Sequence, residues 1–183
     1  MIYEYKGFRP KIAKTAYVSE SATIIGNVNI GEYCFIGPGA VIRCDAEKNA
    51  VNIGDCSVIE DGVLIHLGSL GARCDIGKHV TVGHGAIVHG RLLSDYANVG
   101  MGAVLSLDSV VGKYSVVAEG AVVKQGQQIP ERVVVGGAPA RVLRELQEKD
   151  IALWTLSNEY YVDLTNAYNT PGVLVPVDRE LCE

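Results

Sequence analysis

Residues 99–117 decide the fold of this chain, and they read Val99-Gly-Met-Gly-Ala-Val-Leu105-Ser-Leu-Asp-Ser-Val-Val111-Gly-Lys-Tyr-Ser-Val-Val117. An aliphatic residue stands at every sixth position. The interval continues through the chain in four sets, which are Val18, Ile24, Ile30, Ile36 and Ile42, then Ile53, Ile59 and Ile65, then Ile76, Val82 and Val88, then Val123, Ile129 and Val135. Neither a helix nor a simple strand repeats in this way. A period of six is typical of a hexapeptide β-helix, in which each unit forms one flat side of a coil.

The repeat divides the chain into three parts. Residues 1–137 are predicted to form an all-β solenoid, with hexads from about Pro10 to Val135 that make about six coils, stacked to a height of roughly 30 Å. Residues 138–169 are predicted to form a C-terminal α-helix packed on the solenoid, since Pro139 suits a first helical position. The apolar residues of one helical face would be Leu143, Leu146, Trp154, Tyr161, Leu164 and Tyr168. Residues 170–183 are expected to form an extended tail.

Composition excludes several classes of partner. The formal charge of −5 and the pI near 5.4 argue against nucleic acid and anionic membranes. No stretch approaches the roughly 18 apolar residues of a membrane span, and the first residues lack the apolar core of a secretory signal. The 5 cysteines are odd in number and form no C-x-x-C pair, so we expect reduced, mostly buried thiols in a cytoplasmic protein.

Three of the four histidines, His66, His84 and His89, are candidate metal ligands, whereas His79 is expected to be structural. Imidazole is the usual ligand of Zn²⁺, and three imidazoles leave one coordination position for water. Residues five apart on an extended chain lie roughly 16 Å apart, so His84 and His89 cannot easily bind one ion within one copy. A three-sided prism with threefold packing would supply the third ligand from a neighbour, which predicts a homotrimer with intersubunit metals.

Charged residues follow inward aliphatics on neighbouring coils, at Arg43, Asp45, Glu60 and Asp61. As surface ion pairs they would contribute little to stability. Beside an interface between copies, Arg43 could instead bind two carboxylates and orient the site. For Asp45 and Asp61 the structural and functional interpretations remain equal. Glu60 is assigned a functional role, because a carboxylate near a metal-activated water can accept its hydrogen bond or its proton.

The chain resembles the γ-class carbonic anhydrase family over about residues 10–168. The matching motifs are Arg43-x-Asp45, Ile59-Glu60-Asp61-Gly62 with His66, Gly83-His84-x4-His89-Gly90, Gly100-Met101-Gly102-Ala103, Val135-Gly-Gly-Ala-Pro139-Ala-Arg141-x-x-Arg144-x-Leu146 and Tyr161-Val162-x-Leu164. The resemblance implies a left-handed β-helix, a homotrimer and Zn²⁺, with Fe²⁺ or Co²⁺ as other candidates. The cation would be held by His66 and His89 of one chain with His84 of the next. It further implies an ion-pair network of Arg43, Asp45 and Asp61, with Tyr161 near the site.

Three positions and one segment depart from the family pattern. Glu60 stands where glutamine is common, Asp163 where some members have asparagine, and Arg91 where cysteine is usual. The segment after His66, residues 67–73, lacks the acidic loop that shuttles protons in the most active members. The overall pattern is nearest to relatives associated with phenylacetate or carnitine pathways.

The leading hypothesis is reversible hydration of CO₂ to bicarbonate at a divalent cation, with Glu60 in proton transfer and Tyr161 on the CO₂ side of the site. One alternative is a hexapeptide-repeat acyltransferase that uses acyl-CoA, which needs one histidine base and no metal. Another is a trimeric metal-binding scaffold without turnover, which the missing acidic loop leaves open.

Overall fold

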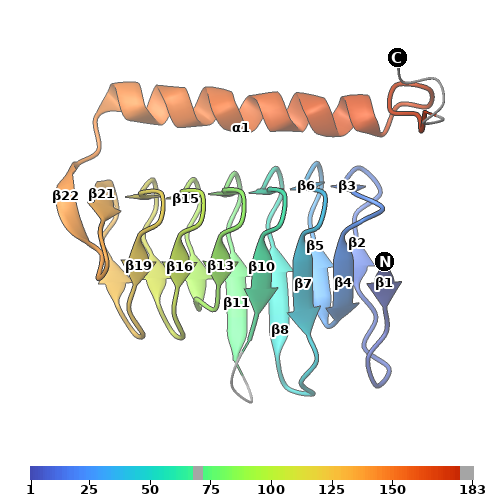
Figure 1. The fold of residues 1–183 in the computed structure, drawn as a ribbon, viewed down its shortest axis with the longest axis horizontal. Coiled ribbons are helices and arrows are strands. Elements are labelled where there is room, and N and C mark those ends of the chain that lie inside the picture. The colour runs from blue at the N-terminus through green and yellow to red at the C-terminus, as the bar shows by residue number, and fades with distance from the viewer. Residues whose placement is uncertain (68–71, 178–183) are drawn as a thin grey trace.

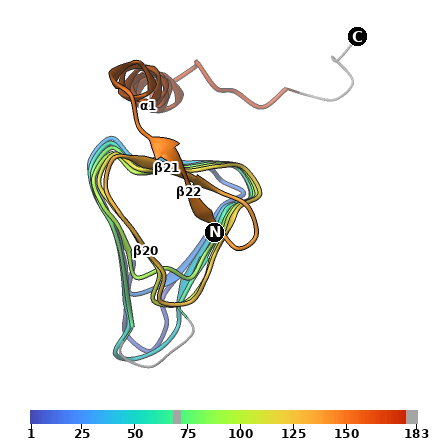
Figure 2. The same ribbon diagram turned by 90° about the vertical axis from the view of Figure 1, so that its left-hand side faces the viewer.

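The structure, a computed structural model, describes residues 1–67 and 72–177. It is a left-handed parallel β-helix shaped as a triangular prism, with one helix along one side (Figures 1 and 2). The predicted fold class is confirmed. Three parallel sheets form the sides, and each strand pairs with the strand one coil further along the chain.

We call the sides sheets I, II and III in chain order. Sheet I contains β1 (Ile2–Tyr3), β4 (Thr23–Gly26), β7 (Val41–Cys44), β10 (Leu64–His66), β13 (Ile87–Val88), β16 (Val104–Leu105) and β19 (Val122–Val123). Sheet II contains β2 (Lys11–Ile12), β5 (Val28–Ile30), β8 (Ala50–Ile53), β11 (Arg73–Ile76), β14 (Leu92–Leu93), β17 (Val110–Val111) and β20 (Gln128–Ile129).

Sheet III carries the helix. Its parallel strands are β3 (Tyr17–Val18), β6 (Phe35–Ile36), β9 (Val58–Ile59), β12 (Thr81–Val82), β15 (Asn98–Val99), β18 (Val116–Val117) and β21 (Val133–Gly136). A final strand, β22 (Arg141–Glu145), pairs antiparallel with β21. The helix α1 (Glu148–Tyr168) runs back along the prism toward the first coils (Figure 1).

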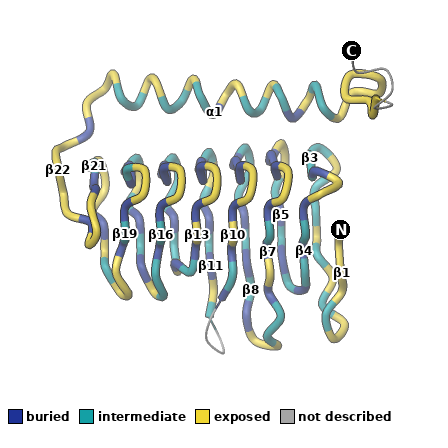
Figure 3. The backbone as a smooth tube through the Cα atoms, viewed as in Figure 1, coloured by how far each residue is buried: buried dark blue, intermediate teal, exposed yellow. Residues whose placement is uncertain are grey.

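The hexad aliphatics fill the interior of the prism, as the sequence predicts. In sheet I the register places Ile65 opposite Val88 and Leu105 opposite Val123, and all four side chains are fully buried. Because each side is only a few residues wide, one inward aliphatic per strand is enough to fill it. Buried positions therefore alternate with exposed corners along the whole prism (Figure 3).

The corners do not all use glycine. Gly62, Gly85, Gly102 and Gly120 have positive φ at the corner between sheets III and I, as expected for tight turns. At the corner between sheets II and III, the positive φ angles belong to larger residues, among them Tyr33, Cys56, His79, Tyr96 and Tyr114. Three of these rings stack, with centroids 4.8 Å apart from His79 to Tyr96 and 4.7 Å apart from Tyr96 to Tyr114. Ring stacking offsets part of the cost of this backbone conformation.

Two boundaries differ from the sequence-based expectation. The first coil includes β1 and β2, so within the described residues sheets I and II each have 7 strands, where about six coils were predicted. The helix begins at Glu148, not at residue 138. Residues 141–145 instead pair with β21, because the last coil would otherwise leave a row of unpaired backbone groups. Leu143 is thus an exposed strand residue, and Leu146 is a buried residue ahead of the helix.

The helix packs on the outer face of sheet III through polar and aromatic contacts. Asn158 is buried and accepts a hydrogen bond from His79 Nδ1 (3.1 Å) when that nitrogen is protonated, and its own amide donates to the Cys56 carbonyl (3.0 Å). Tyr168 meets Tyr17 edge to face at 5.0 Å. His79 therefore has the structural role that the sequence indicated.

The described cysteines are unpaired thiols. Cys34, Cys44 and Cys74 are buried, and burial raises the pKa of Cys34 and of Cys74 to about 12, so these thiols stay protonated. Cys182 lies outside the described residues. Within residues 1–67 and 72–177, no helix is both long and apolar enough to cross a membrane.

Candidate metal centre

His66 and His89 lie one above the other at the corner between sheets I and II. His66 follows Ile65 and His89 follows Val88, and these two aliphatic residues are paired in the register of β10 and β13. Their ring centroids are 5.3 Å apart, with an interplanar angle of 82°. Burial lowers the pKa of His89 below its ordinary value, and His66 and Arg43 lower it further. The neutral form that metal binding requires is therefore favoured at His89.

Arg43 and Asp45 lie beside this histidine pair, from the coil before. Arg43 is opposite His66 in the register of β7 and β10. Arg43 Nη2 is 3.2 Å from His66 Nε2, and a guanidinium only donates hydrogen bonds, so the contact suits a His66 Nε2 that carries its lone pair. Asp45 Oδ2 is 3.5 Å from Arg43 Nε, and Asp45 Oδ1 is 3.4 Å from His66 Nε2. Arg43 thus holds the ring of His66, and Asp45 pairs with Arg43.

His84 lies at a different corner, between sheets III and I, in the turn Gly83-His84-Gly85. The buried Glu60 from the coil before accepts a hydrogen bond from the backbone N–H of His84 at 2.9 Å. The same oxygen, Oε2, is 3.1 Å from His84 Nε2, and Asp61 Oδ2 is 3.7 Å from His84 Nδ1. Glu60 therefore fixes both the turn and the ring.

The width of sheet I separates His84 from the other two histidines. Among the described residues of one copy, no three His, Cys, Asp or Glu side chains come together in a group that could hold a metal. The three imidazoles suit Zn²⁺ as donors, and two of them already stand together. The prediction that His84 of a second copy completes the set therefore stays a prediction.

Tyr161, from α1, lies near Glu60. It projects from α1 against Phe35, with ring centroids 5.1 Å apart and an interplanar angle of 60°. Burial raises the pKa of the Tyr161 hydroxyl well above its ordinary value, and the charge and hydrogen bond of Glu60 raise it further. Tyr161 therefore stays neutral beside the Glu60 carboxylate.

Sequence reasoning missed the exposed apolar residues around the histidines. Leu64 and Ile87 precede the inward aliphatics of β10 and β13, and they lie 37% and 40% exposed on the outer face of sheet I. Met101 occupies the next turn after His84, where the Gly102 N–H donates to the His84 carbonyl at 2.9 Å. Leu64 and Ile87 stand at the outward position just before an inward aliphatic, where a side exposed to water usually carries a polar residue. The hexads therefore contained the signal.

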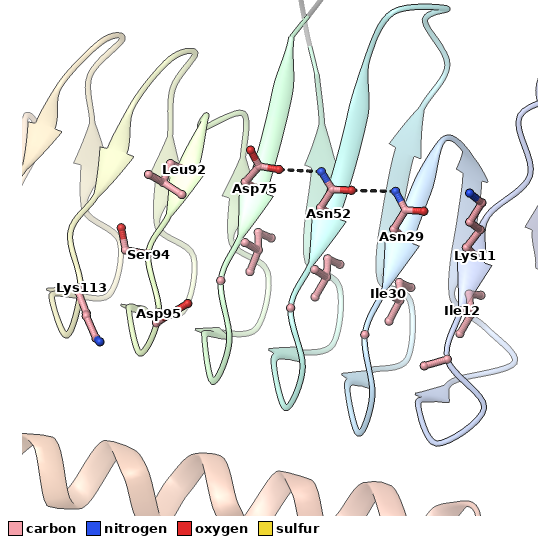
Figure 4. Close-up of a pocket in the computed structure, with 16 residues that line it drawn as sticks. Lys11, Ile12, Asn29, Ile30, Asn52, Asp75, Leu92, Ser94, Asp95 and Lys113 are labelled. Carbon is pink, nitrogen blue, oxygen red and sulfur yellow. Dashed lines mark hydrogen bonds between the residues drawn. The ribbon is translucent and has the colours of Figure 1, made fainter.

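A groove of about 920 Å³ lies on another side of the prism, along sheet II (Figure 4). A ladder of amides forms one wall, in which Asn29 donates to Asn52 at 2.8 Å and Asn52 donates to Asp75 at 2.7 Å. None of the three candidate histidine ligands lines it. The groove and the histidines are therefore separate features.

The hexads, the three parallel sheets and the corner imidazoles define the class of the protein, a hexapeptide-repeat β-helix protein. A scan against protein-family models found no match. The chain is 40% identical over 164 residues to the mitochondrial γ-carbonic anhydrase 1 of Arabidopsis thaliana. The matched residues cover 87% of this chain and 59% of the relative. It is 35% identical over 166 residues to the carnitine operon protein CaiE of Escherichia coli, over 88% of this chain and 81% of the relative.

Among solved structures, a Bacillus cereus protein named as an acetyltransferase has a TM-score of 0.88 and 33% identity, over 92% of this chain and 96% of the other. The chain belongs to the γ-carbonic anhydrase-like hexapeptide-repeat family. It spans 59% of the length of the plant γ-carbonic anhydrase that it matches.

Proposed function

We propose that this protein is a homotrimer that reversibly hydrates CO₂ to bicarbonate at divalent-cation sites shared between its copies. One observation carries the proposal. His66 and His89 stand together at one corner of the prism, and His84 is held by Glu60 at the next corner. Each copy thus presents two ligands on one edge of sheet I and one ligand on the other edge, which suits a closed ring of identical copies.

The outer face of sheet I supports the assembly. Leu64 and Ile87 lie exposed on it, between the two ligand corners. Apolar side chains in such a position are typical of a surface that another copy covers. Packing of sheet I around a threefold axis would bury this apolar row and bring each His84 to the neighbour's His66 and His89.

The family relationship suggests a metal cofactor, and the three imidazoles favour Zn²⁺, with Fe²⁺ or Co²⁺ as other candidates. A divalent cation with three neutral imidazoles lowers the pKa of water to about 7 and so supplies a nucleophile for CO₂. Arg43 and Asp45 would orient His66. Glu60 Oε2 would orient the attacking water and accept its proton, with Asp61 next to it on the proton's path to solvent. Tyr161 would close the side of the site that faces the helix.

Two departures from the family pattern suggest modest turnover. A carboxylate at Glu60 changes the hydrogen bonding of the site relative to glutamine. The segment after His66 carries no acidic residue among Leu67-Gly-Ser-Leu-Gly-Ala-Arg73, of which 68–71 lie outside the described residues. Protons would then leave through buffer or through Glu60. We also propose a cytoplasmic location, because the described thiols are unpaired.

Mixing two inactive variants tests the shared site. His84→Ala removes the ligand on one edge of sheet I. The double variant His66→Ala with His89→Ala removes the two ligands on the other edge. When the two chains are unfolded together and refolded as mixed trimers, about one quarter of the interfaces regain a full ligand set. We expect metal content and CO₂ hydration to return to about that fraction. Each variant refolded alone is the control, and no recovery in the mixture would reject sharing.

The acetyltransferase name of the Bacillus cereus relative favours a second candidate, transfer of an acyl group from acyl-CoA. This chemistry needs one histidine as a general base and no cation. Acyl transfer that survives removal of the metal would support it. Bound metal without either activity would indicate a scaffold.

A further inference from the structure

The segment after the helix carries apolar side chains that its own prism does not cover. We call residues 170–177 the C-terminal arm. Val173, Leu174, Val175 and Val177 are 52–62% exposed in the single copy. Four such side chains within eight residues are expensive to leave in water, at about 25 cal/mol for each Å² of apolar surface. A partner surface for the arm is therefore expected.

The arm does not pack tightly on its own coils. Leu174, Val175 and Pro176 line an open space of about 850 Å³ together with Ile2 and Tyr17 of the first coils. Figure 2 shows the arm leaving the end of α1, passing above sheet III and reaching beyond the corner between sheets III and I. It thus projects over the edge of the prism that carries His84.

This inference rests on the proposed shared site, because that site fixes which part of the neighbouring copy the arm approaches. In the proposed trimer, the corner with His84 lies against the neighbour's corner with His66 and His89. That neighbouring corner joins sheet I to sheet II. An arm that continues past the His84 corner therefore comes out over the neighbour's sheet II, at the same end of the prism.

The groove on sheet II has the character that such an arm needs. Apolar residues of sheet II line it, among them Ile30, Ile53 and Ile76, which are 3–4% exposed. The Asn29–Asn52–Asp75 ladder offers amide and carboxylate groups along one wall (Figure 4). An apolar floor beside hydrogen-bonding groups suits an extended, valine-rich segment.

We propose that the C-terminal arm of each copy lies in the sheet II groove of the next copy around the trimer. The arm enters at the Lys11 end of the groove, which belongs to the same first coils as the space under the arm. Each interface then has two parts, the shared ligands at the corners and an exchanged arm beside them.

Photocrosslinking in the full chain tests the exchange directly. A benzophenone amino acid replaces Leu174, and chains labelled with ¹⁴N and ¹⁵N are refolded together before irradiation. We expect crosslinks between light and heavy peptides, and the sheet II strands β2, β5 and β8 should carry them. Crosslinks only within one chain, to residues 1–21, would overturn the proposal.

Two further measurements on the same sample separate this inference from the function. If mass and metal content indicate an intact metal-bound trimer and no arm crosslinks between copies, the exchange is wrong and the shared site stands. If the protein is monomeric, both are wrong.

A variant pair adds a thermodynamic test. Leu174→Asp should weaken trimer association by about tenfold, whereas Leu156→Asp, at an exposed apolar position on α1, should not. Equal effects of the two substitutions would count against the arm.

Discussion

Individual polar residues orient the imidazoles of this protein. Glu60 is the clearest case, because it contacts both the backbone and the ring of His84. Its Oε2 accepts the backbone N–H of His84 and lies 3.1 Å from the His84 ring. Glu60 also raises the pKa of the nearby Tyr161 hydroxyl. Removing a group that holds a metal ligand typically lowers metal affinity by about 10- to 100-fold.

We therefore expect Glu60→Ala to weaken metal binding by about 10-fold or more, since it frees the turn and the ring together. Glu60→Gln keeps an oxygen acceptor for the His84 N–H, so it should retain the metal and change only the pH profile of CO₂ hydration. Competition with a chelator of known affinity measures the first effect. Equal metal affinity in all three proteins would contradict this role of Glu60.

Glycine 112 illustrates a second constraint at the residue scale, the distance between coils. A Cβ atom there would lie 2.5 Å from the Glu131 nitrogen and from the Pro130 carbonyl carbon, and both are backbone atoms that cannot move away. Gly120 has a positive φ of 64° but open space around its Cβ position. One glycine therefore serves packing and the other serves backbone conformation.

Gly112→Ala should destabilise the fold by about 3 kcal/mol through overpacking. Gly120→Ala should cost about 1 kcal/mol, because only the left-handed backbone conformation is penalised. Urea unfolding of the two variants under identical conditions gives the comparison. A larger loss for Gly120→Ala would mean that the coils can separate more easily than the structure indicates.

At the scale of elements, the start of α1 depends on charge. Asp150 accepts a hydrogen bond from the Gln147 backbone N–H at 2.9 Å and pairs with Arg144 of β22. These contacts lower the pKa of Asp150 from its ordinary value of 3.8 to about 2. A carboxyl whose pKa is lowered by folding stabilises the folded state above the ordinary value, and this contribution disappears as the pH falls through the lowered value.

Between pH 4 and pH 2 we expect the first turn of α1 to lose protection while the prism stays folded. Amide hydrogen exchange of residues 147–152, read by mass spectrometry, measures this local opening. Asp150→Asn removes the titrating group, so its first turn should already be less protected at pH 7 and should change little with pH. A pH dependence that survives in Asp150→Asn would assign the effect to another group.

At the scale of the whole molecule, the proposed metal and the assembly are thermodynamically linked. A cation bound by two chains stabilises only the associated folded state, so its effect grows with both metal and protein concentration. The Tm of the metal-loaded protein should rise with protein concentration, and removal of the metal should reduce that dependence. A Tm that depends on metal at every dilution, but never on protein concentration, would indicate a site inside one chain.

The sequence by itself determined the prism and the pairing of two histidines. Six residues per side with one inward aliphatic leave a regular coil as the arrangement that buries them all. Three hexads, which make one full coil, separate Ile65 from Val88, and His66 and His89 therefore return to the same corner in the structure.

The tertiary structure alone decided where the helix starts, which residues turn at the corners and what holds His84. β22 forms because the last coil has an open edge, and no local signal in residues 138–147 reports that edge. Non-glycine residues at the corner between sheets II and III adopt a positive φ because the coil turns there, and the rings of His79, Tyr96 and Tyr114 stack across neighbouring coils. These features depend on contacts between coils or with the edge of the last coil, and their free energy exists only once the coils have stacked.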